Sequence, residues 1–197
     1  MIISTGGTEL EEIDELVATV RECGNNNLTL LVCTSSYPAL PIDAHLSRIS
    51  TLQKRFNVKV GVSDHTLGIG VSVAAIALGA VAVEKHLTLR RSDGGADGAF
   101  SMEPIEFAQL VKEGKSAFES IGESNWSIQQ SERESRRLRR SLHITRAVSK
   151  GEKVSLENIR AIRPNGGLPP KYLEEVLGRE FNESFEIGTP LSFDQLD

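Results

Sequence analysis

The sequence is poor in cysteine, in aromatic residues and in excess positive charge. Two cysteines among 197 residues cannot build a disulfide framework, so Cys23 and Cys33 are expected to be reduced thiols. The net charge of −5 provides no basic field to attract nucleic acid. The longest apolar run, residues 69–83, contains three breaks and is too short to span a bilayer, and no signal peptide precedes it. We therefore expect a cytoplasmic protein that binds neither nucleic acid nor a membrane.

The first 121 residues alternate between short apolar runs and amphipathic segments. Strands are expected at residues 1–4, 28–33, 58–62 and 81–84, and helices at residues 8–23, 44–56, 69–80 and 103–121. Thr8 and Glu11 fit a capping box, and Gly24 fits a helix end. This alternation predicts parallel βαβ units. Periodicity alone allows an open doubly wound sheet or half of an eight-stranded barrel. A strand at the extreme N-terminus also suggests that preceding elements are absent.

The composition changes after Gly122, where a polar segment predicts a linker over residues 122–140. Arginine fills five of the ten positions from Ser131 to Arg140, but Glu132 and Glu134 are interleaved with it. This pattern favours a solvated linker helix over an anion-binding patch. The remaining residues contain a weak repeat, in which residues 150–159 match residues 187–196. Each copy predicts a strand, a glycine turn and a serine-capped turn, and so a small β-rich module.

Polar side chains follow all four expected strands. In a parallel α/β layer, the carboxyl ends of the strands form the ligand-binding edge. His65 and His86 each follow a strand directly, and these strands are consecutive. Neutral imidazoles bind divalent transition metals, so the two histidines predict an open site for Mn²⁺, Zn²⁺ or Fe²⁺, unless each only forms a hydrogen bond within its loop. Glu84 and Lys85 fit either a catalytic pair or an ion pair at a strand end.

The hydroxyl-rich turns after the first two strands have two interpretations. Ser4, Thr5 and the segment Thr34–Ser36 could donate hydrogen bonds to a phosphate or carboxylate. Ordinary turn and cap chemistry explains such residues equally well. His45 and His143 are expected to be structural or exposed, and Cys33 to be a packing residue.

Several stretches together resemble one family. IISTGG, LLVCTSSYP, VGVSDHTLG, VEKHLTL and DGGADGAFSMEP occur in this order, and they resemble the sialic acid synthase family, the nonulosonate synthases that condense phosphoenolpyruvate with an amino sugar. DGGADGAFSMEP is most similar to the pseudaminic acid synthase branch, although legionaminate and N-acetylneuraminate synthases share the same frame. IRPNGG and the repeat around it resemble the antifreeze-like SAF domain of these enzymes.

The resemblance implies a fold and a domain order. Residues 1–121 would form the second half of a TIM (β/α)8 barrel, with four βα units, and residues 141–197 a small β-rich SAF domain after the linker. It also implies a homodimer with swapped cap domains, in which Arg163 reaches the sugar site of the partner subunit.

The resemblance also implies roles for individual residues. His65 and His86 would be the catalytic residues and would hold Mn²⁺ or Mg²⁺. Ser4, Ser35 and Ser63 would contact phosphoenolpyruvate, although neuraminate synthases often have Asn at the position of Ser35. Tyr37 and Asp97 would contact the N-acetylated amino sugar. The expected reaction joins phosphoenolpyruvate to a 2,4-diacetamido-trideoxyhexose, giving pseudaminic acid and phosphate, with N-acetylneuraminate or legionaminate synthesis as the alternative.

The chain departs from the family pattern at one point. It has no equivalent of the first four barrel strands, which in the family carry an acidic residue and lysines that bind phosphoenolpyruvate. We therefore expect this chain to be inactive alone, or to work only with a complementary fragment or as an oligomer. The rival interpretation is a non-catalytic module that binds carbohydrate or a partner. A Rossmann domain is disfavoured because no G-x-G-x-x-G follows any strand.

Overall fold

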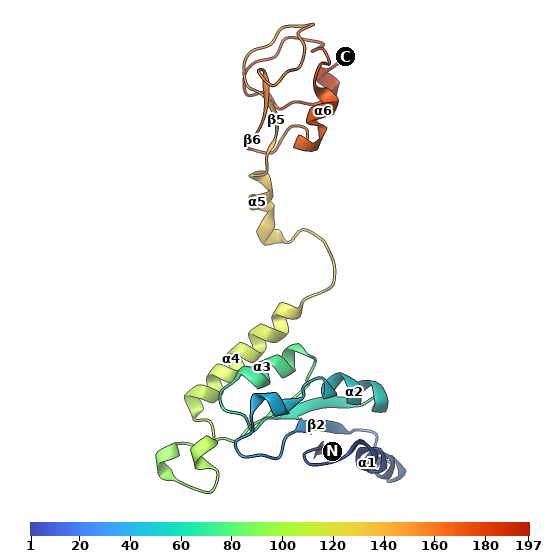
Figure 1. Cartoon of the computed structure of the whole chain (residues 1–197), viewed down its shortest axis with the longest axis vertical. Helices are drawn as coiled ribbons and strands as arrows, with labels where there is room; N and C mark the ends of the chain where they lie inside the picture. The colour runs from blue at the N-terminus through green and yellow to red at the C-terminus, as the bar shows by residue number, and fades with distance from the viewer. The chain divides into compact units, whose positions relative to one another are not determined.

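The computed structural model describes residues 1–197, and the chain divides into two compact units (Figure 1). The first unit is Met1–Ser124 and the second is Asn125–Asp197. Their boundary falls inside segment 122–140, which the sequence analysis assigned to a linker. The helices include none that is long and apolar enough to cross a membrane.

The first unit alternates four strands with four helices. In chain order the elements are β1 (Ile2–Ser4), α1 (Leu10–Glu22), β2 (Thr29–Cys33), α2 (Arg48–Phe56), β3 (Lys59–Ser63), α3 (Gly70–Ala77), β4 (Val83–Glu84) and α4 (Pro104–Ile121). The strands form one sheet in the order β1-β2-β3-β4, and all three pairings are parallel. The order never reverses, so the sheet has no switch point of the doubly wound kind. Sequential order is the arrangement of strands in a (β/α) barrel, and it decides between the two architectures that periodicity left open.

The core of the first unit lies between the sheet and its helices. α1 buries Ile13, Val17 and Val20, which share one face at helical spacing. The strands, α2 and α3 contribute further buried members, namely Leu30, Val32, Ile49, Leu52, Phe56, Val60, Val62 and Ala75. β2 is buried at four of its five positions, as expected for a parallel strand covered on both faces.

β1 and β4 are the edge strands of this sheet. Ile2 on β1 is 65% exposed. Beside β4, an apolar groove of about 550 Å³ runs between α3 and α4, and its lining includes Ile76, Val83, Leu110 and Phe118. The sheet therefore leaves apolar surface uncovered at its edges, as expected for an open half-barrel.

Some expected boundaries were wrong by a few residues for local reasons. The capping box of α1 uses Glu9 and Glu12, whereas Thr8 donates its hydroxyl to the Thr5 carbonyl. The expected helix at residues 44–56 begins only at Arg48, because a separate 3₁₀ turn precedes it and ends at His45 with φ 42°. β4 is two residues long rather than four.

The second unit is built around the antiparallel pair of β5 (Ser141–Ile144) and β6 (Ile159–Ile162). Two short helices, α5 (Arg133–Arg137) and α6 (Leu173–Val176), complete its elements, and α5 lies in the arginine-rich segment. The core includes fully buried side chains from widely spaced parts of the chain, namely Leu142, Ile144, Ile159, Val176, Phe181 and Leu191.

The two copies of the repeat have the same local hydrogen bond. The Ser155 amide donates to Oδ1 of Asn158 at 2.8 Å, and the Ser192 amide donates to Oε1 of Gln195 at 3.0 Å. The turn glycines also match, since Gly151 and Gly188 have φ values of 78° and 89°. The sequence repeat therefore corresponds to a repeated turn, although regular strand is limited to β5 and β6.

Gly167 lies where three segments of the second unit meet. A Cβ atom there would lie 2.1 Å from the carbonyl oxygen of Leu142 and 2.9 Å from the backbone nitrogen of Leu191. We expect Gly167→Ala to destabilise this unit by roughly 1–3 kcal/mol, the usual cost of overpacking. Its neighbour is a matched control, because a Cβ at Gly166 would make only ordinary contact with Pro190 at 3.6 Å. Faster amide hydrogen exchange across residues 141–197 in Gly167→Ala, but not in Gly166→Ala, is the expected result; equal exchange would contradict it.

Candidate functional site

The candidate site is built on successive cross-strand pairs of β3 and β4. In the observed register Val62 lies opposite Val83 and Ser63 opposite Glu84. The Ser63 hydroxyl donates to Oε1 of Glu84 at 2.6 Å. The pairing continues past the strand ends, since the Asp64 amide donates to the Glu84 carbonyl at 2.9 Å.

His65 and His86 lie together at this edge. Their ring centroids are 5.1 Å apart with the planes at 71°. His65 is buried, and its Nδ1 lies 2.9 Å from the Thr34 carbonyl oxygen. A carbonyl only accepts, so in the neutral imidazole Nδ1 carries the proton and Nε2 has the free lone pair. This is the tautomer that a metal-binding histidine adopts when a backbone carbonyl orients it.

His86 has a carboxylate and two aromatic rings around it. Its Nδ1 lies 3.6 Å from Oδ2 of Asp97, which is within ion-pair range but longer than a hydrogen bond. The Phe100 ring centroid is 5.2 Å from that of His86, and the Tyr37 centroid is 5.8 Å away. Tyr37 also lies 4.3 Å from His65, centroid to centroid. Four rings and one carboxylate thus form one cluster, in which the side chain of His86 is 30% exposed.

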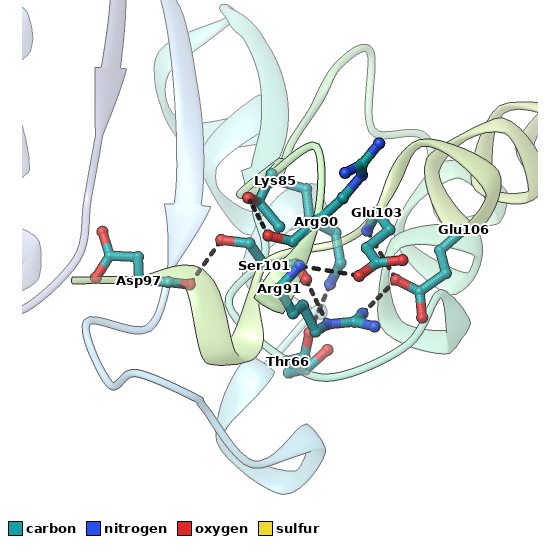
Figure 2. Close-up of polar contacts among 9 residues, drawn as sticks. Thr66, Lys85, Arg90, Arg91, Asp97, Ser101, Glu103 and Glu106 are labelled. Atoms are coloured by element: carbon teal, nitrogen blue, oxygen red, sulfur yellow. Dashed lines mark hydrogen bonds and ion pairs between the residues drawn. The ribbon is translucent and has the colours of Figure 1, made fainter. Parts of the chain in front are cut away.

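The loop that carries Asp97 and Phe100 is held by Arg91 (Figure 2). Nε of Arg91 donates to the Ser101 carbonyl at 3.0 Å, and its guanidinium also pairs with Glu106 at the start of α4. The Ser101 hydroxyl donates in turn to the Asp97 carbonyl at 2.7 Å. The pKa of Glu106 lies below its usual range. The main cause is the hydrogen bond from the Glu103 amide, and the second is the hydrogen bond from Arg91.

A buried ion pair lies next to the histidines in the chain. Nζ of Lys85 is 3.0 Å from Oδ2 of Asp64, and the two side chains are 3% and 0% exposed. Asp64 also accepts hydrogen bonds from the Thr66 amide, the Thr66 hydroxyl and the Ser72 hydroxyl, at 2.8, 2.7 and 2.5 Å. Lys85 donates a second bond to the Thr66 carbonyl at 2.6 Å. Burial raises the pKa of Asp64, but the bonds from Ser72, Thr66 and Lys85 outweigh it and hold that pKa below its ordinary value.

The predicted hydroxyl residues lie at the same edge of the sheet. Ser4 and Ser63 end β1 and β3, and Ser35 is in the loop after β2. Gly6 packs against Ser35 so closely that a Cβ would lie 2.3 Å from its Oγ, so the first two loops touch. Ser4 is exposed, and its Oγ accepts a bond from the Gly6 amide at 3.4 Å.

Arg163 belongs to the second unit and is exposed directly after β6. His143 is buried there and contacts Ser141. Cys33 is buried as expected, with Sγ 3.9 Å from Nδ1 of His65.

Two features of the site were missed in the sequence. Phe100 was not selected, and a single aromatic residue in a glycine-rich loop gives no signal for its contact with His86. Lys85 was expected either to act with Glu84 or to pair with it, but the structure pairs it with Asp64. A signal existed, because strand alternation points Asp64 and Lys85 to the face opposite Ser63 and Glu84.

The site offers two imidazoles as metal ligands. No group of three or more His, Cys, Asp or Glu side chains is placed to hold a metal ion. The free Nε2 of His65 and the adjacent His86 fit a divalent ion whose other positions are taken by water or substrate oxygens. Hydroxyl donors at the same edge fit an anionic substrate.

Comparisons with known proteins show the family to which the chain belongs. The model of the NeuB family matches residues 1–125, and that of the SAF domain matches residues 139–197. Pseudaminic acid synthase of Campylobacter jejuni is 36% identical over 190 residues, covering 96% of this chain and 55% of that protein. N,N'-diacetyllegionaminic acid synthase of Legionella pneumophila is 35% identical over 202 residues. This match covers 100% of this chain and 57% of the Legionella protein.

A solved structure shows the same fold. The spore coat polysaccharide biosynthesis protein SpsE of Bacillus subtilis matches with a TM-score of 0.59 and 29% identity, covering 100% of this chain and 61% of that one. The chain thus spans little more than half the length of the curated relatives described above.

The buried ion pair makes a stability prediction. Lys85→Met leaves Asp64 as an uncompensated buried charge, so we expect the free energy of unfolding to fall by roughly 3–5 kcal/mol. Lys115→Met is the control, because Lys115 is 75% exposed and pairs only with Glu119 four residues on; it should change stability by under about 0.5 kcal/mol. Urea unfolding followed by circular dichroism measures both, and equal midpoints would refute the prediction.

Proposed function

The chain belongs to the NeuB family, and we propose that it carries the metal-binding side of the active site of a nonulosonic acid synthase. This is a transferase that condenses phosphoenolpyruvate with an N-acetylated amino sugar and releases phosphate. The names of the Campylobacter and Legionella relatives support this reaction class. We further propose pseudaminic acid as the product and a 2,4-diacetamido-trideoxyhexose as the sugar. The two relatives have nearly the same sequence identity to the chain. The choice of pseudaminic acid therefore rests on the resemblance of DGGADGAFSMEP to the pseudaminic acid synthase branch.

The observation that carries the proposal is the histidine pair at the carboxyl ends of β3 and β4. Nδ1 of His65 is committed to the Thr34 carbonyl, which leaves Nε2 for a metal beside His86. We propose Mn²⁺ or Mg²⁺, and nitrogen ligands favour Mn²⁺ of the two. Such an ion, when bound, polarises a carbonyl oxygen as a Lewis acid.

The surrounding residues would bind and orient the substrates. The hydroxyls of Ser4 and Ser35 can donate to the carboxylate and phosphate of phosphoenolpyruvate. The Ser63 hydroxyl donates its one hydrogen to Glu84, so it can donate to the substrate only after it rotates away from Glu84. Tyr37 is 53% exposed beside His65 and presents an aromatic face and a hydroxyl to a sugar. Asp97 can accept hydrogen bonds from sugar hydroxyl or amide groups. Arg163 would reach the sugar site of the partner subunit in a homodimer.

Metal binding tests the histidine pair directly. His65→Ala and His86→Ala should each weaken Mn²⁺ binding at least tenfold, because each removes one of two protein ligands. Isothermal titration calorimetry of the metal-free chain with MnCl₂ measures the affinity.

A third histidine provides the control for this titration. His45 is exposed and has φ 42°, a conformation that Asn tolerates, so His45→Asn should bind Mn²⁺ as the unchanged chain does. Binding that survives His65→Ala would contradict the proposed site.

Turnover tests the reaction. Phosphate release from phosphoenolpyruvate should be absent with this chain alone. It should appear when the chain is combined with the part of the Campylobacter jejuni relative that it does not cover. With Mn²⁺ present, the expected order of rates is 2,4-diacetamido-trideoxyhexose above N-acetylmannosamine, and His86→Ala should abolish release.

Three outcomes would change these conclusions. Robust release by the chain alone would overturn its proposed inactivity. Faster turnover of N-acetylmannosamine would reassign the substrate. Sugar binding that is independent of Mn²⁺, without release in any combination, would favour a non-catalytic carbohydrate-binding module.

A further inference from the structure

We propose that the buried Asp64–Lys85 ion pair is a register lock, a pair of positioning residues that holds His65 and His86 opposite one another. Each histidine directly follows one member of the pair in the chain. The metal-binding part of this inference rests on the function proposed for the histidines, whereas the register part does not.

The regular ladder between β3 and β4 is the shortest in the sheet. It contains two residue pairs, whereas the ladder between β2 and β3 contains five. A slip of one residue turns every side chain of a strand to the other face. No strand pairs with the other side of β4 itself, although backbone bonds from Val81 to Val60 and from Asp64 to Glu84 flank the ladder, and Met102 pairs with the segment after β4.

The ion pair adds a side-chain constraint to these backbone bonds. Continuing the observed register by one residue places Asp64 beside Lys85, and by two residues places His65 beside His86. Alternate residues point to opposite faces, so the ion pair and the histidine pair occupy opposite faces of the same two strands. One contact on the helix-facing side of the sheet therefore sets the distance between the two imidazoles on the opposite side.

The hydrogen bonds of Asp64 make this contact selective. Three of its bonds come from Thr66 and Ser72, which follow β3 in the chain and fix the carboxylate in place. Lys85 is its partner from β4. A slip by one residue would bring Glu84 or His86 to the carboxylate. Glu84 would place two carboxylates together in a buried position, and His86 would leave the face that carries His65, so both neighbouring registers are disfavoured.

Two measurements test the register lock in the double variant Asp64→Asn/Lys85→Met, which removes both charges together. The first uses the metal-free chain and records the nuclear Overhauser effect between the two imidazole rings. In the same sample, hydrogen exchange is followed at the Asp64 amide, which donates to the Glu84 carbonyl. We expect the inter-ring effect to be lost and that amide to exchange faster. The second is Mn²⁺ affinity by calorimetry, expected to fall about 10–100-fold as for other residues that orient metal ligands.

Ile49→Ala separates this effect from a general loss of stability. Ile49 lies on the buried face of α2 and is 0% exposed in the core between the sheet and its helices. This variant should unfold more easily but retain the inter-ring contact and bind Mn²⁺ within about twofold of the unchanged chain. Equal losses in both variants would mean that the ion pair is only structural, and would overturn the proposal.

The two readouts also separate this proposal from the function. If the unchanged chain binds no Mn²⁺ at His65, the metal site fails, and the metal-free measurements alone decide the register. The register lock would be overturned if the double variant kept the inter-ring nuclear Overhauser effect and the slow exchange of the Asp64 amide that the unchanged chain shows. If the double variant does not fold, Lys85→Arg and Lys85→Gln replace it. The lock predicts that Arg retains the inter-ring contact and Gln weakens it, and equal behaviour refutes it.

Discussion

The parallel pairing of β3 with β4 is the constraint on which the candidate site depends. Three successive cross-strand contacts follow one another there: the Ser63–Glu84 hydrogen bond, the Asp64–Lys85 ion pair and the His65–His86 ring contact. The second contact lies on the side of the sheet that faces the helices, and the first and third lie on the opposite side. The residues of the candidate site are thus positioned by polar contacts made on the helix-facing side.

Burying that ion pair carries an energetic cost. Removing a carboxylate and an ammonium from water costs several kcal/mol per ion, and their mutual attraction alone seldom exceeds this. Asp64 lowers the cost by accepting three further hydrogen bonds, and Lys85 by donating a second one. An apolar pair of similar volume could stabilise the unit at least as well. The retained charges therefore make more physical sense as a source of specificity than as a source of stability, which agrees with a role in fixing the register.

Much of the first unit could be predicted from sequence, because its information is local. Helical spacing in α1 and the apolar runs of β2 and β3 define those elements without reference to the rest of the chain. The strand order could not be predicted in this way, since periodicity within one element says nothing about its neighbours. Both histidines were found from their position after strands. Phe100 was not, because it reaches His86 through a loop whose conformation depends on Arg91 and Glu106. The length of β4 was overestimated because Val81 and Ala82 continue its apolar run without a residue that marks the start of the strand.

The same sheet explains why this chain could bind a metal without being able to catalyse a complete reaction. Two imidazoles need only the adjacent ends of β3 and β4, and the first unit provides both. Charge stabilisation for a phosphorylated substrate requires cationic donors aimed at its oxygens. At this edge, however, the ammonium of Lys85 is already committed to Asp64 and Thr66, and Arg91 to Ser101 and Glu106. The uncovered groove beside β4 and the exposed Ile2 on β1 lie at the two edges where a closed barrel would continue. Neither Lys85 nor Arg91 is therefore free to bind a phosphorylated substrate such as the proposed phosphoenolpyruvate, and this is the physical basis for expecting little turnover from the four βα units alone.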